Sequence, residues 1–93
     1  PVWDAEVLPV HGAAAVTQLV HRLGAMVLTV LLLALAALAM RDARRRLALL
    51  LLLLLALQLV AGVLMVATGL ALPIALAHNL LASMMLAVAL RLI

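Results

Sequence analysis

Cysteine is absent from the 93 residues, and aromatic residues make up only 1% of them. Without cysteine the chain cannot form disulfides, thiolate-ligated iron–sulfur clusters or cysteine-type zinc sites. Charged residues are scarce at 10%, whereas a soluble domain needs far more polar surface to cover its core. Lysine is missing, and four of the six arginines fall in one short cluster, so a nucleic-acid-binding surface is not indicated.

Hydrophobic residues account for 72% of the chain, which is typical of an integral membrane protein. At roughly 20 residues per span, the length allows about three spans and leaves no room for a separate soluble domain. In lipid a helix satisfies its own backbone polar groups within a single span, so we predict an all-α membrane bundle. The chain begins at Pro1 without an initiator methionine, so we expect that a preceding segment was removed or left out.

Three apolar segments are separated by two polar or turn-forming stretches. "RDARRR", at 41–46, carries charges too dense for hydrocarbon, and "TGLALP", at 68–73, contains a glycine and a proline typical of a turn. These breaks predict transmembrane helices at 15–40, 47–68 and 74–93 and an extracytoplasmic lead-in at 1–14.

The distribution of arginines predicts an orientation. Four arginines lie in the 41–46 stretch and Arg91 lies at the far end of the third segment, on the same side, whereas only Arg22 lies opposite. Because positively charged loops stay in the cytoplasm, we expect the amino terminus outside and the carboxyl terminus inside the plasma membrane.

Two histidines lie at matching depths in this topology. His21 lies about six residues inside the first segment, and His78 lies about five residues inside the third, both counted from the outer face. Two imidazoles facing each other across a helical bundle suit the axial positions of a heme iron. Taken alone, each histidine is also consistent with a different role, that of a polar residue that hydrogen-bonds a neighbouring helix. Zinc is less favoured, because no third ligand lies at that level.

Small residues surround both histidines. Gly24 and Ala25 share a helical face with His21, Ala82 shares one with His78, and Gly62 of the second segment lies at the same level. Small side chains leave room for a heme, but they also permit tight packing of membrane helices. The methionines at 26, 84 and 85 are interpreted as packing residues rather than ligands.

Polar residues near the histidines suggest further roles. The Arg22 guanidinium suits a heme propionate or an interfacial anchor, and Gln18, one turn before His21, suits a propionate or a lipid headgroup. Gln58 lies near the middle of a leucine-rich segment, so its amide should face another helix. His11 is expected to be exposed to solvent.

The stretches "QLVHRLGA", "LQLVAGVLMVATGL" and "LPIALAHNLLASMMLA" resemble the heme A synthase family over residues 16–93. Proteins of that family consist of two similar four-helix halves. Each half has one histidine early in its second helix and one early in its fourth. On this resemblance, His21 and His78 match the two heme ligands of one half. The missing fourth helix would come from a preceding segment, a partner subunit or self-association.

The resemblance implies oxidation of the C8 methyl of heme O to the formyl of heme A, with heme b bound in this half. The catalytic half of the family usually has a glutamate three residues before its first histidine, and this position here is Gln18. The resemblance is therefore to the cofactor half, and this segment alone is not expected to carry the catalytic carboxylate.

Two other functions remain open on sequence grounds. "TQLVHR" also has some similarity to the heme b anchors of succinate dehydrogenase, which transfer electrons without being the catalytic subunit. "AHNLLAS" lacks the charged residues expected around the second ligand of those anchors. A purely structural subunit, in which both histidines only bond neighbouring helices, is the third alternative.

Overall fold

The computed structural model describes the backbone of residues 2–93 and the side chains from Gly12 onward. It contains three helices, which are α1 (Val2–Met40), α2 (Arg45–Ala67) and α3 (Leu72–Leu92), and no strand in residues 2–93. All three are long and apolar enough to cross a membrane, α1 over Gly12–Met40. The predicted all-α membrane fold with three spanning helices is confirmed.

The helix bounds differ in detail from the predicted segments. Helix α1 begins at Val2 rather than near residue 15, because backbone bonding continues upstream of the point where hydropathy rises. Helix α2 begins at Arg45, inside the charged stretch, and α3 begins at Leu72, so that Pro73 lies in its first turn. A proline is tolerated there because the first N–H groups of a helix have no acceptor within it.

A glycine-centred cap ends α2. The Leu70 N–H donates to the Met65 carbonyl and the Gly69 N–H to the Val66 carbonyl, at 2.8 and 3.3 Å. Gly69 and Leu70 have φ angles of 64° and 66°, and only the glycine adopts this left-handed conformation without steric cost. This cap reverses the chain between α2 and α3.

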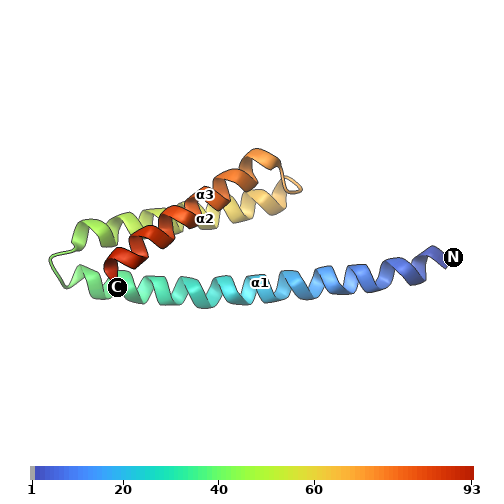
Figure 1. Ribbon diagram of the computed structural model, residues 1–93, viewed down its shortest axis with the longest axis horizontal. Helices are drawn as coiled ribbons and strands as arrows, with labels where there is room; N and C mark the ends of the chain where they lie inside the picture. The colour runs from blue at the N-terminus through green and yellow to red at the C-terminus, as the bar shows by residue number, and fades with distance from the viewer. Residues whose placement is uncertain (1) are drawn as a thin grey trace. The chain divides into compact units, whose positions relative to one another are not determined.

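The chain divides into two compact units, residues 1–30 and residues 31–93, which are described separately. In the second unit α2 and α3 run antiparallel, side by side (Figure 1). Part-buried and buried residues recur on α3 at alternating spacings of four and three, the pattern of a left-handed helical seam. They are Ile74, His78, Leu81, Met85, Val88 and Leu92.

The core of this unit lies at the end that carries the arginine-rich loop. Leu51 of α2 is fully buried. Val88 of α3 and Ala36, which lies in the last turns of α1, are buried in the same cluster. These side chains are small or unbranched at Cβ in most cases, which allows helices to approach closely in lipid. The three helices therefore share one apolar cluster at this end.

One arginine of the loop joins the α1–α2 loop to the end of α3. Arg44 donates from Nη1 to the Leu92 carbonyl at 2.6 Å and from Nη2 to Asp42 Oδ2 at 3.2 Å. The last carbonyls of a helix have no donor within the helix, and a cation there also complements the helix dipole. The α1–α2 loop and the end of α3 consequently lie together, as the predicted topology requires.

Residues 12–30 of the first unit are mostly exposed along α1. The Thr17 and Thr29 hydroxyls donate to the carbonyls of Ala13 and Ala25, at 2.9 and 2.7 Å. Because these hydroxyls bond to their own helix, they need no partner elsewhere in an apolar environment.

Candidate functional site

His78 lies on the face of α3 that packs against α2. A Cβ added at Gly62 would lie 3.7 Å from Cε1 of the His78 ring, which is ordinary van der Waals contact. Counting residues from the sequence placed Gly62 and His78 at one level, and this contact agrees with that count. The imidazole therefore lies directly beside this glycine, and a methyl group here would still fit next to the ring.

The His78 ring has a buried nitrogen that no group in the described side chains, residues 12–93, satisfies. Nδ1 is buried and has no hydrogen-bond partner. A polar atom left unpaired in an apolar environment costs roughly 1–3 kcal/mol. The arrangement therefore favours a role in which this ring is held by another group.

Gln58 lies on α2 one helical turn before Gly62. Its side chain is part-buried, and Oε1 is buried without a hydrogen-bond partner. The amide oxygen is accordingly buried, which agrees with the expectation that this residue faces another helix. Gln58 and His78 hold the two buried side-chain N or O atoms that lack a partner within residues 12–93.

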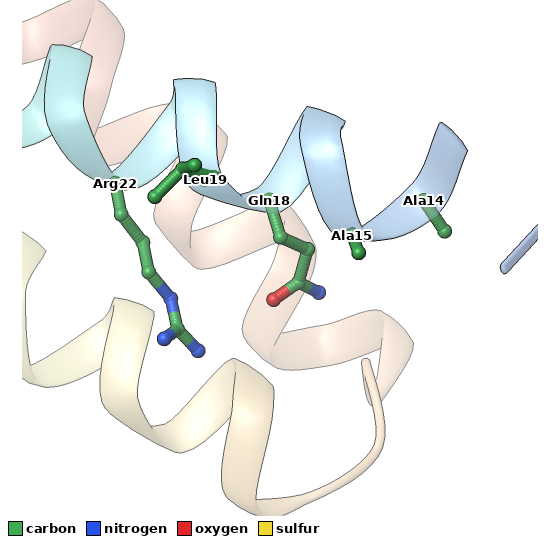
Figure 2. A pocket seen from close by; sticks show the side chains of 5 residues that line it. All are labelled: Ala14, Ala15, Gln18, Leu19 and Arg22. Atoms are coloured by element: carbon green, nitrogen blue, oxygen red, sulfur yellow. The ribbon is translucent and has the colours of Figure 1, made fainter. Parts of the chain in front are cut away.

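Gln18 and Arg22 extend from the same side of α1, one turn apart (Figure 2). Together with Ala14, Ala15 and Leu19 they line an open pocket on this helix face. A guanidinium and an amide here, among small side chains, provide donors for an anionic or carbonyl group. The structure brings these two predicted residues together.

His21 is exposed on α1, and Gly24 follows it by three residues, on an adjacent part of the same face. A Cβ added at Gly24 would meet no atom within 4 Å, so the helix face beside the imidazole is open within its own unit. His21 belongs to the unit of residues 1–30 and His78 to the unit of residues 31–93. Their pairing on one iron stays a prediction.

Carboxylates are absent from the spanning helices over residues 12–93, where Asp42 in the α1–α2 loop is the sole acidic residue. Within these residues no group of three or more His, Cys, Asp or Glu side chains gathers into a metal-binding cluster. A bis-histidine heme requires only two protein ligands, so His21 and His78 are the available candidates. His11, predicted to be solvent-exposed, lies outside the residues whose side chains are described.

Two features were not foreseen from the sequence. The bond from Arg44 to the Leu92 carbonyl could not be predicted from the sequence, because all four arginines at 41–46 can donate in the same way. The burial of His78 Nδ1 was not foreseen, because it depends on how α2 and α3 are rotated about their axes. The matching distances of Gly62 and His78 from the turn were the sequence signal that the two residues meet.

Comparison with known proteins agrees with the motifs. Searches among curated proteins and among solved structures find no match. A family model, COX15-CtaA, described as cytochrome oxidase assembly protein, matches residues 3–90. This match covers nearly the whole chain, including both histidines and the Gln58 helix. The chain therefore belongs to the COX15-CtaA family of cytochrome oxidase assembly proteins, the heme A synthase family.

Proposed function

We propose that this chain binds heme b, with His21 and His78 as the two axial ligands, in a heme A synthase-like protein. Family membership supports the broader role, which is a heme A synthase-like part in cytochrome oxidase assembly. The proposal adds the cofactor, its ligands and the division of labour between this segment and the rest of the assembly.

The observation that carries the proposal is the environment of His78. Its imidazole lies against Gly62, in an interhelical seam, and Nδ1 has no hydrogen-bond partner within residues 12–93. Iron needs only one ring nitrogen, so a ring that packs against α2 can bind the metal through Nε2 while Nδ1 bonds a neighbouring group. A ring that packing holds in one place suits ligation to a metal.

The α1 residues fit a heme as well. His21 has open space beside Gly24, so a flat macrocycle would not be obstructed on that face. Arg22 would neutralise a propionate through paired N–H donors, and Gln18 would donate from its amide to the same kind of group. When bound, the heme would supply a redox-active iron, and these side chains would bind and orient it.

The membrane orientation proposed here follows from the arginines. Arg44 joins the loop to the end of α3, so the loop arginines and Arg91 lie at one end of the second unit. We place this end in the cytoplasm and the turn that follows α2 outside, because basic residues are retained on the cytoplasmic side. Both ligand candidates then lie in the outer part of the plasma membrane.

The same residues predict what this segment does not do by itself. Gln18 holds the position one turn before His21, where the catalytic half of the family would have a carboxylate. An amide donates and accepts hydrogen bonds but cannot take up a proton at physiological pH as a general base does. The chain is therefore proposed as the cofactor half, and heme O oxidation would use residues beyond these 93. The helix that completes the four-helix half would come from another segment, a partner or a second copy.

The orientation predicts opposite labelling of two single-cysteine variants. The chain has no cysteine, so Asp4→Cys and Ala43→Cys each introduce one unique thiol. A membrane-impermeant maleimide should label Asp4→Cys from outside intact spheroplasts and Ala43→Cys only after the membrane is opened. Labelling of both thiols from one side would remove the depth match between His21 and His78.

If both histidines bind the heme iron, His21→Ala and His78→Ala should each abolish the six-coordinate, low-spin heme spectrum. Each variant should lose the heme or retain it in a five-coordinate, high-spin form, because one axial nitrogen is missing. His11→Ala is the control and should keep the low-spin spectrum. An unchanged six-coordinate heme in both ligand variants would refute the assignment.

The Gln18 position predicts that the 93-residue chain holds heme b but makes no heme A. The assay is co-expression with a heme O source, followed by chromatography of the extracted hemes, for the chain and for its Gln18→Glu variant. Heme A should be absent with the unmodified chain, whether or not the glutamate restores activity. Heme A made by the unmodified chain would show that the carboxylate is dispensable and that catalysis resides here.

A further inference from the structure

We propose that Gln58 is a positioning residue for His78: its amide oxygen accepts a hydrogen bond from the Nδ1–H of the ring, directly or through one water. This inference rests on the proposed function, because it assigns the opposite ring nitrogen, Nε2, to the iron. Gln58 then acts through His78 and does not itself contact the metal.

Two complementary groups lie in one seam. Oε1 of Gln58 is an acceptor, Nδ1 of a neutral imidazole can be a donor, and both are buried without a partner. Leaving each unpaired among apolar side chains would cost free energy twice, whereas one bond between them removes both costs. A single hydrogen bond between Gln58 and His78 would therefore satisfy both buried atoms.

Gly62 connects the two positions geometrically. Gln58 and Gly62 are four residues apart and share the α2 face, and the His78 Cε1 atom lies against Gly62. Cε1 is bonded to Nδ1, so that nitrogen lies beside the same part of α2. Gly62 places no side chain beside the ring, and the glutamine side chain has enough rotatable bonds to turn its amide toward Nδ1.

Other polar side chains near this end of the helix pair do not compete for the ring. The Thr68 hydroxyl donates to the Leu64 carbonyl at 2.7 Å, and the Ser83 hydroxyl donates to the Asn79 carbonyl at 3.2 Å. Both residues are exposed, as is Asn79. Buried neighbours on the seam, such as Ala61 and Met85, offer no side-chain oxygen.

The bond would have a defined chemical effect on the ligand. An acceptor at Nδ1 keeps the proton on that nitrogen and leaves the Nε2 lone pair free for the iron. It also fixes the ring orientation and makes the imidazole a stronger electron donor. A stronger donor stabilises ferric heme, so loss of the bond should raise the reduction potential.

The first test uses the heme-free chain and no variant of Gln58. Nitrogen-15 spectra of the histidine-labelled chain in lipid bilayers, with the His78 signals assigned by their loss in His78→Ala, report the tautomer and the hydrogen bond. We expect a neutral ring with a hydrogen-bonded Nδ1–H. A ring protonated at Nε2, or an Nδ1–H without a bond, would overturn the inference whatever the heme content.

The second test compares heme-loaded Gln58→Met with Leu57→Met. Methionine nearly preserves the volume of glutamine, and Leu57 is an exposed position on the same helix, so this control introduces the same side chain away from the seam. Gln58→Met should weaken heme retention by about 10- to 100-fold, raise the reduction potential and alter the low-spin electron paramagnetic resonance signal. Leu57→Met should leave all three unchanged.

The outcomes separate this inference from the proposed function. If the unmodified chain binds no heme, the proposed function fails, and the nitrogen-15 result still decides whether Gln58 bonds His78. If the chain binds heme through both histidines and Gln58→Met has the unmodified potential and resonance signal, the positioning role fails while the proposed function stands. A purely structural role would change stability without shifting the potential.

Discussion

The requirement that a buried polar atom be paired in an apolar environment governs this protein. Hydrophobic residues make up 72% of the chain, so each polar group within a span has few possible partners. The threonine and serine hydroxyls meet the requirement through carbonyls of their own helices. His78 and Gln58 make no such bond, and within residues 12–93 the buried atoms Nδ1 and Oε1 have no partner. The proposed amide bond follows from this contrast, and it leaves Nε2 of His78 for the proposed cofactor.

The packing of α2 against α3 creates that environment. The glycine-centred cap at Gly69 reverses the chain, and the seam then brings Gly62 and His78 to one level. At the opposite end Arg44 joins the loop to the last carbonyls of α3. The helix pair is thus connected at both ends, with its polar residues between the turn and the apolar core. Such a scaffold would hold the His78 ring in one orientation for the proposed cofactor.

Much of the fold could be predicted because its determinants are local. The charges at 41–46 and the glycine and proline at 69 and 73 mark the two breaks, and hydropathy marks the spans. Counting residues about the turn also placed Gly62 level with His78. The helical extension upstream of residue 15 was not predicted, because hydropathy locates the lipid-spanning part of a helix rather than its first hydrogen-bonded residue. The distinct role of Arg44 was not predictable, since it depends on where α3 ends in space.

The central claim is that this chain retains a six-coordinate heme b, and a reduced-minus-oxidised spectrum followed by pigment extraction tests it most directly. The purified chain, supplied with heme during expression and washed in detergent, should show sharp low-spin bands and release heme b on extraction. A chain that is folded, helical and membrane-inserted yet carries no extractable pigment would contradict the account. His21 and His78 would then serve only helix packing.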